Sequence, residues 1–319
     1  MTPTTSSGSW PTLRLGEWRD SYATLHLYSQ IVGKTRLALA PMENHWWQVA
    51  LYVTARGLTT SPMPFGERVL QVDFDFIDHS LVVRTSDGDT RSLALVPRSV
   101  AEFYREYTAL LHAAGVDARI WPVPVELPEV IPFEEDRQHR SYDPDAVDRF
   151  RRILLQANRL MHEFRGRFLG KASPVHFFWG SFDLAASRFS GRRAPPHPGG
   201  APHVADWVMQ EAYSHEVSSA GFWPGGGAVD EAAFYSYAYP EPKGFADALI
   251  KPGAAYYSRE LGEFVLPYEA VRSASSPDDA VLDFFQSTYA AAADLGKWDR
   301  TALERGADES TGKMKDGGR

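Results

Sequence analysis

The chain has 319 residues, which is enough for one large domain or two ordinary domains whose cores need no disulfides. Its net charge of −8 argues against a general nucleic-acid-binding protein. Cysteine is absent, which excludes disulfides, thiolate metal sites and cysteine nucleophiles. The sequence contains no apolar run of membrane-spanning length and no secretory signal at its N-terminus. We therefore expect a soluble, cytoplasmic protein that does not contact membranes.

The first half of the chain is predicted to be a helix, a set of strands and a second helix. Residues 1–9 are small and polar, and we expect them to be disordered. Apolar periodicity predicts a helix near 18–32 and a second helix over 99–115, which has a capping box. The expected strands between them are 45–55, 68–77, 80–86 and 90–96, and an edge strand is expected at 118–128. This half is assigned to residues 10–130.

The second half repeats the same order. An acidic segment, 131–143, is expected to link the halves, and the second half then runs over 144–298. It begins with a predicted helix over 144–169 and ends with one over 278–296. A short helix is expected at 204–212, and strands are expected at 174–189, 214–223, 232–240 and 263–271. The polar tail 299–319 is expected to be disordered.

Local matches between the halves indicate an internal duplication. The sequence "IVGK", ending at Lys34, matches "FLGK", ending at Lys171, and "HWW" at His45 matches "HFF" at His176. The final helices of the two halves align without a gap. We therefore predict an α+β protein made of two tandem helix–antiparallel sheet–helix repeats, related by pseudo-two-fold symmetry and packed as one unit. A pocket between the repeats would be a natural ligand site.

Several common catalytic motifs fail in this sequence. "IVGKT" resembles the end of a phosphate-binding loop, but the required glycine is replaced by Tyr28. No GxSxG surrounds Ser181 or Ser219, and His215 lacks a second histidine four residues later. The sequence therefore assigns no familiar reaction.

A first candidate site lies in "SPVHFFWGSFDLAASRFSGRRAPPH". As one continuous strand, it would place Asp183 on one face with Trp179 and Ser181, and His176 on the other. Both faces are apolar, so Asp183 should be buried and must find a partner or shift its pKa. The candidate partners are the arginines that follow it, Arg188, Arg192 and Arg193. A structural Asp–Arg pair is the simpler alternative to a catalytic role.

A second candidate site lies in "EAYSHEVSSAGFWPGGG". His215 and Glu216 could serve as a general base or as metal ligands, although neighbouring strand residues point to opposite faces. A metal bound by nitrogen and oxygen ligands from His176, His215 and Glu216, with His197 and His203 nearby, is conceivable but is not demanded by the spacing. By contrast, Asp73 and Asp75 in "DFDFIDH" fit the solvent face of an amphipathic strand.

The chain resembles an uncharacterised bacterial family, the domain of unknown function 5996. The resemblance runs from about Trp10 to Trp298. It rests on five long segments: "LHLYSQIVGKTRLALAP", "NHWWQVALYVTARGLTTSPMP", "DFDFIDHSLVVRTSDG", "SPVHFFWGSFDLAASRFSGRRAPPHPG" and "EAYSHEVSSAGFWPGGG". The resemblance implies no activity, cofactor or catalytic residue.

Our leading hypothesis is a small-molecule-binding protein, or an enzyme, with an aromatic-lined polar pocket between the repeats. The candidate catalytic residues are His215, Glu216 and Asp183, with Arg193 as an anion stabiliser. The candidate ligand-binding residues are His45, Trp47, His176, Trp179, Arg193 and Trp223. The alternatives are a metal-dependent enzyme and a non-catalytic protein-interaction domain. The sequence does not specify whether the protein is an enzyme, nor its cofactor, its ligand or its oligomeric state.

Overall fold

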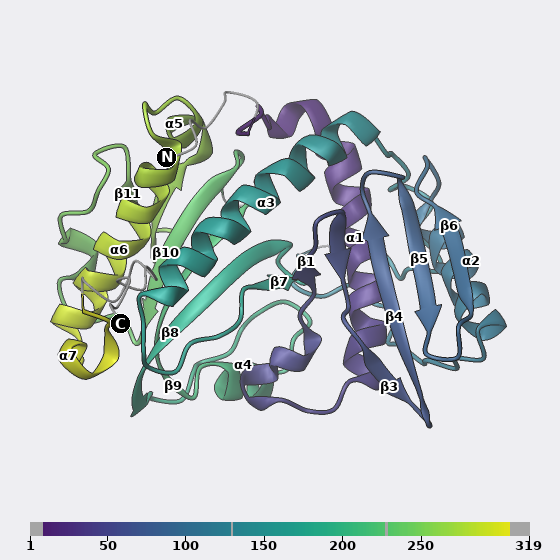
Figure 1. Cartoon of the computed structure of the whole chain (residues 1–319), viewed down its shortest axis with the longest axis horizontal. Helices are drawn as coiled ribbons and strands as arrows, with labels where there is room; N and C mark the ends of the chain where they lie inside the picture. Colours follow the sequence, from purple (N-terminus) through teal and green to yellow (C-terminus); the bar gives the residue numbers. More distant parts are fainter. Residues whose placement is uncertain (1–8, 129, 227–228, 307–319) are drawn as a thin grey trace, which may run out of the picture.

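Two antiparallel sheets form the framework of the computed structural model, which describes residues 9–128, 130–226 and 229–306 (Figure 1). The first sheet has the order β1-β2-β4-β5-β6, with β3 paired to β4. Its strands are β1 (Tyr52–Val53), β2 (Gly57–Thr59), β3 (Met63–Phe65), β4 (Arg68–Asp75), β5 (Ser80–Thr85) and β6 (Thr90–Ala94). The second sheet has the order β11-β12-β10-β9-β8-β7. Its strands are β7 (His176–Phe178), β8 (Asp183–Arg193), β9 (His215–Trp223), β10 (Ala233–Tyr239), β11 (Tyr256–Ser258) and β12 (Glu263–Pro267).

Long helices precede and follow each sheet. They are α1 (Leu15–Leu39) and α2 (Val100–Ala113) around the first sheet, and α3 (Pro144–Gly166) and α6 (Pro277–Leu295) around the second. In Figure 1, α3 and α6 lie in front of the second sheet, so its opposite face is free of long helices. The shorter elements are η1 (Asn44–Val49), α4 (Asp206–Ala212), η2 (Phe245–Asp247), α5 (Tyr268–Arg272) and α7 (Arg300–Leu303). Within the described residues, no helix is both long and apolar enough to cross a membrane.

The first sheet is amphipathic, as the alternation of its sequence predicts. In β4, Leu70, Val72 and Phe74 are buried, whereas the residues between them keep solvent contact. Asp73 pairs with Arg84, and Asp75 pairs with Arg56. The predicted solvent-facing role of these two aspartates is confirmed, and they are surface ion pairs rather than a site.

The two halves are joined through main-chain and side-chain contacts. Leu51 and Phe177 exchange two backbone hydrogen bonds, with N–O distances of 2.9 and 2.8 Å, which connect the β1 and β7 edges of the two sheets. The indole of Trp179 donates to the carbonyl of Val49 at 2.7 Å, and its ring lies directly against Gly33 of α1. The segment expected to be a linker also packs onto the first half, since Ala101 N–H donates to the Asp136 carbonyl at 2.9 Å. The expectation of one packed α+β unit is consistent with these contacts.

Four expected strands differ from the structure. Segment 263–271 is a strand, β12, only as far as Pro267, and it continues as helix α5 from Tyr268. The other three differ for local reasons. Segment 45–55 begins as η1, because His45 and Trp46 adopt left-handed φ values of 60° and 62°, which a strand does not allow. Segment 174–189 is a hairpin rather than one strand, since Gly180 and Phe182, with φ of 59°, form the turn between β7 and β8. Segment 118–128 forms no strand, and it contains three prolines that cannot donate to a sheet.

The contact between Gly33 and Trp179 provides a test of how the halves are joined. A Cβ atom at position 33 would lie 2.2 Å from the Trp179 ring, so Gly33→Ala must displace that ring from the interface. We expect a loss of about 1–3 kcal/mol in the free energy of unfolding, which is typical of overpacking. Urea denaturation measures it.

Gly16→Ala, in the same helix, is the matched control. A Cβ atom at position 16 would meet no other atom within 4 Å, so this change should be neutral or slightly stabilising. Equal stability of the two variants would contradict the described packing of Trp179.

Candidate functional site

Asp183 is a buried carboxyl group that has hydroxyl partners instead of a cation. It is the first residue of β8 and is only 6% exposed. The hydroxyls of Ser181 and Tyr235 donate to its two oxygens. No arginine, lysine or histidine of the described chain forms an ion pair with it. Burial raises the pKa of Asp183, and the two hydroxyl hydrogen bonds oppose that rise.

The register of the sheet explains how Tyr235 reaches Asp183 from two strands away. Ala185, Gly221 and Tyr235 lie side by side on β8, β9 and β10, so they share a face. Gly221 has no side chain, and the Tyr235 ring crosses over it towards β8. A Cβ atom at position 221 would lie 2.2 Å from this ring. Glycine at position 221 is therefore a requirement of the Tyr235–Asp183 contact.

A pocket of about 470 Å³ opens near this contact, and we call it the tyrosine pocket. It is lined by residues of β10, β12 and the adjoining loops. The aromatic and ionisable members are His197, Tyr213, Tyr237, Tyr239, Glu241 and Glu263. Asp183 adjoins this pocket through Tyr235, whose ring lies parallel to that of Tyr237 with 6.2 Å between centroids.

A series of hydrogen-bonded hydroxyl groups runs from the pocket across the sheet. Tyr213 and Tyr237 share a hydrogen bond with an O–O distance of 2.7 Å. Ser219 approaches Tyr237 and forms a 3.1 Å hydrogen bond with Ser187 on β8. Burial is the main cause that raises the pKa of Tyr237 to about 12, so this hydroxyl is protonated at neutral pH. The inner wall of the pocket is therefore neutral and able to donate or accept hydrogen bonds.

The charge of Asp183 affects the pKa values of two further acids. Burial, and secondarily Asp183, raise the pKa of Glu263 to about 7. The same causes, in the same order, raise the pKa of Glu126 to about 7, and its carboxyl lies against Gly180. Glu126 is exposed and does not line the pocket, whereas Glu263 is half-buried and does. We therefore assign Glu263, and not Glu126, to the pocket. Neither carboxyl has a hydrogen bond or ion pair to another described residue.

The expected grouping of Asp183 with the arginines is wrong. Arg188 points to the opposite face of β8, where it packs on the Phe164 ring at 3.4 Å under α3. Arg193 is exposed and lies at the far end of β8, beyond a bulge and roughly 25 Å from Asp183 at the usual rise of a strand. Arg192 pairs with Glu216 at 2.6 Å. The partner of Asp183 is therefore a tyrosine from β10, which the local sequence does not reveal.

His215 and Glu216 also do not act together with Asp183. His215 pairs in register with Arg193 at the far end of β8, and Glu216 accepts from Arg192 and from Ser190 at 2.8 Å. The two side chains point to opposite faces, as expected for neighbours in a regular strand. A shared cavity for Asp183, Arg193 and His215 is excluded by this separation, although a separate role for each stays a prediction.

His215 belongs to a second group of side chains, the histidine cluster, formed by His45, Trp47, Lys171, Phe189 and His215. The Lys171 ammonium donates to Nε2 of His45 at 2.7 Å, while Nδ1 of His45 donates to the Ala212 carbonyl at 2.9 Å. The rings of His45 and His215 lie 5.7 Å apart. Burial is the first cause that lowers the pKa of His45 and of Lys171. The structure thus brings three of the predicted residues together, away from Asp183.

The remaining predicted residues are distributed between these groups. His176 is 1% exposed, neither ring nitrogen has a partner, and its ring lies 5.7 Å from Trp47. Burial, followed by nearby arginines, lowers the pKa of His176 to about 3, so it is neutral. Trp179 is part of the interface with α1. Trp223 lies at the Asp183 end of β9 and contacts the hydroxyl of Tyr22.

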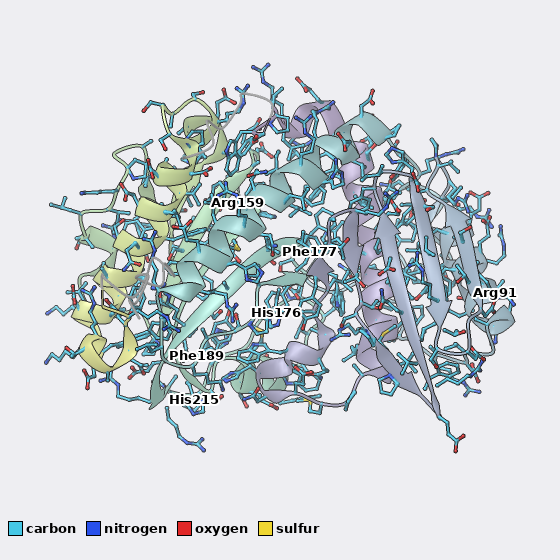
Figure 2. All side chains as sticks on the ribbon, viewed as in Figure 1. Arg91, Arg159, His176, Phe177, Phe189 and His215 are labelled. Atoms are coloured by element: carbon cyan, nitrogen blue, oxygen red, sulfur yellow. The ribbon has the colours of Figure 1, made fainter. Side chains whose placement is uncertain are left out.

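The expected metal ligands are too far apart to share one ion. His176 pairs with Ala185 and His215 with Arg193, eight residues along β8, and the rings of Trp47 and His45 lie between the two histidines. Figure 2 shows His176 and His215 at separate places along this strand. In the described part of the chain, no group of three or more His, Asp or Glu side chains is placed to hold a metal ion.

The tyrosines of the pocket were missed by reasoning from sequence, although a signal was present. In "YSYAY", Tyr235, Tyr237 and Tyr239 recur at every second position, which places three tyrosines on one face of a strand. Glu263 and Glu126 carry no comparable signal, because a single acid beside a strand is ordinary. Their significance depends on tertiary contacts alone.

Fold and site together define an α+β protein of two antiparallel sheets, with a carboxyl- and tyrosine-lined pocket on the face of the second sheet opposite α3 and α6. Residues 10–305 match the family of unknown function DUF5996, and the chain belongs to this family. Neither curated proteins nor solved structures give a significant match to the chain. The family assignment therefore agrees with the resemblance noted from the sequence motifs, and it brings no activity with it.

The Tyr235–Asp183 hydrogen bond can be tested by removing one oxygen atom. Tyr235→Phe leaves a buried carboxyl with one hydroxyl partner fewer, so we expect it to destabilise the protein by about 1–3 kcal/mol. Tyr256→Phe, on the edge strand β11 and 48% exposed, should change stability by less than about 0.5 kcal/mol. Chemical denaturation of both variants measures the difference, and similar small effects would show that the contact contributes nothing.

Proposed function

We propose that the protein binds a small molecule in the tyrosine pocket and that Asp183, Tyr235 and Glu263 are its working polar groups. The observation that carries the proposal is a solvent-reachable pocket of about 470 Å³ beside carboxyls that have no cationic partner in the described chain. Natural ligand pockets have volumes of this order and combine aromatic walls with a few convergent polar groups. Carboxyls that serve only the fold are more often paired.

The same groups could also move a proton. A carboxyl with a pKa of about 7, such as Glu263, can act as an acid or a base near neutral pH. The hydroxyls of Tyr235 and Tyr237 remain protonated there and can donate to a developing negative charge. Acid–base catalysis on the bound molecule is therefore within the means of this pocket, and binding is the part of the proposal to test first.

Fragment screening by ligand-observed NMR tests binding directly. We expect fragments that bind the wild-type protein and are lost in Leu261→Trp, which places a large ring at the mouth of the pocket. Leu249→Trp is the control, because Leu249 is 99% exposed and does not line the pocket. A screen with no hits, or with hits that bind Leu261→Trp unchanged, would overturn the proposal.

The raised pKa of Glu263 predicts a pH-dependent effect on stability. The folded protein holds this proton more tightly than the unfolded chain, whose pKa is near 4.5. The free energy of unfolding therefore falls as pH rises from about 4.5 to about 7 and is level above that. Glu263→Gln cannot ionise, so we expect its melting temperature to exceed that of the wild type by a few degrees at about pH 8.

The gain from Glu263→Gln should disappear near pH 4.5, where both proteins carry a neutral side chain at this position. Glu260→Gln removes the same charge from the same hairpin at an exposed position and is the matched control. We expect it to change the melting temperature equally at both pH values. A gain for Glu263→Gln that is independent of pH would contradict the burial of its carboxyl.

We also propose that the two halves arose by duplication. In support, the two lysines of the matched "GK" motifs have reciprocal surroundings. Lys34 of the first half lies 5.9 Å from the ring of Trp179 in the second, and Lys171 lies 5.2 Å from the ring of Trp47 in the first. A pseudo-two-fold relation would give each lysine an aromatic partner in the opposite half, although Trp47 aligns with Phe178 rather than with Trp179.

A further inference from the structure

The tyrosine pocket carries negative charge without an opposing cation. Glu241 and Glu263 line it, and no lysine or arginine does. Glu241 accepts a hydrogen bond from the Tyr257 hydroxyl, whereas Glu263 has no hydrogen-bond or ion-pair partner among the described residues. Asp183 stands behind the pocket, also without a cation. A carboxylate taken out of water is unfavourable unless an opposite charge approaches it, so this pocket is electrostatically complementary to a cation.

The aromatic walls of the pocket also favour a cation. The rings of His197, Tyr213 and Tyr239 form a three-sided group, with centroids separated by 4.6 Å, 5.0 Å and 5.4 Å. Aromatic rings carry negative charge on their faces and attract cations. Burial lowers the pKa of His197, so its ring is neutral at neutral pH and adds no repulsion. Tyrosine rings around an acidic group are the surroundings in which organic ammonium groups are bound.

Size and geometry distinguish an organic cation from a metal ion. The pocket volume of about 470 Å³ suits a small organic molecule. Within the described residues, no set of three His, Asp or Glu side chains converges as metal ligands. The carboxyls therefore surround a space that is larger than one coordinated ion requires.

We infer that the tyrosine pocket recognises a small organic molecule through an ammonium group, with Glu263 opposite the charge and the rings of Tyr213, Tyr237 and Tyr239 against its carbon atoms. This inference rests on the proposed function, because it names the ligand class of the same pocket. The ligand is thus a small organic cation, and Glu263 is the residue that determines specificity for its charge.

Calorimetric titration with two ammonium probes and their neutral analogues tests the inference. The probes are choline, paired with the alcohol in which a tert-butyl group replaces the trimethylammonium group, and putrescine, paired with butanediol. Ionic strength is held constant with sodium chloride. We expect at least one probe to bind about tenfold more tightly than its neutral analogue, which corresponds to about 1.4 kcal/mol. We expect Glu263→Gln to weaken that probe about tenfold and the exposed control Glu260→Gln to leave it unchanged.

The outcomes separate this inference from the proposed function. If fragments bind in a Leu261→Trp-sensitive manner but both probes bind no better than their analogues, the ammonium class is wrong and the pocket remains a ligand site. If a probe binds equally well to Glu263→Gln and Glu260→Gln, Glu263 is not its anchor and the assignment fails. If neither fragments nor probes bind at all, the proposed function itself falls.

Discussion

The burial of Asp183 without a cation is the constraint on which the rest of the second half depends. A carboxyl in this position must receive hydrogen bonds, and the available donors are the hydroxyls of Ser181 and Tyr235. Tyr235 can supply its hydroxyl only across a strand that lacks a side chain at Gly221. The tight turn between β7 and β8 brings Ser181 back towards the same carboxyl. The carboxyl of Asp183 thus links the β7–β8 turn, the register of β8 to β10 and the glycine at position 221.

The electrostatic effect of Asp183 reaches the tyrosine pocket. The charge of Asp183 adds to the effect of burial in raising the pKa of Glu263 and of Glu126. Two half-buried acids elsewhere in the protein, Asp73 and Glu216, are paired with arginine. The acids near the tyrosine pocket have no such partner in the described chain. The absence of such a partner is the reason for proposing a function at the tyrosine pocket.

Local patterns predicted much of the fold, because they depend on residues close in sequence. The capping box of Ser99 and Glu102 marks the start of α2, and the alternation in β4 gives its buried face. Segment 45–55 failed, since nothing local announces the left-handed His45 and Trp46. The hairpin at Gly180 was mistaken for one continuous strand, which placed Trp179 beside Asp183, whereas Trp179 contacts Val49 and Gly33. Ser181, which was grouped with Asp183 as well, is a true partner.

The site was predicted only in part, because its contacts are distant in the chain. The sequence indicated that Asp183 is buried and needs a partner, and that is the case. Its partner Tyr235 lies 52 residues away, and Arg193, which is close in sequence, is carried along the strand to the opposite end. His176 and His215, which were considered as ligands of one metal ion, pair with different parts of β8, at Ala185 and at Arg193.

The most direct test of this account is the titration of the Glu263 carboxyl, followed by carbon-detected NMR of protein labelled at glutamate side chains, with Glu263→Gln for assignment. We expect a pKa of about 7, because this carboxyl is desolvated, has no cationic partner among the described residues and is close to Asp183. A pKa near the ordinary 4.5 would show a solvated or cation-paired group, and the case for a cation-binding pocket would then be lost.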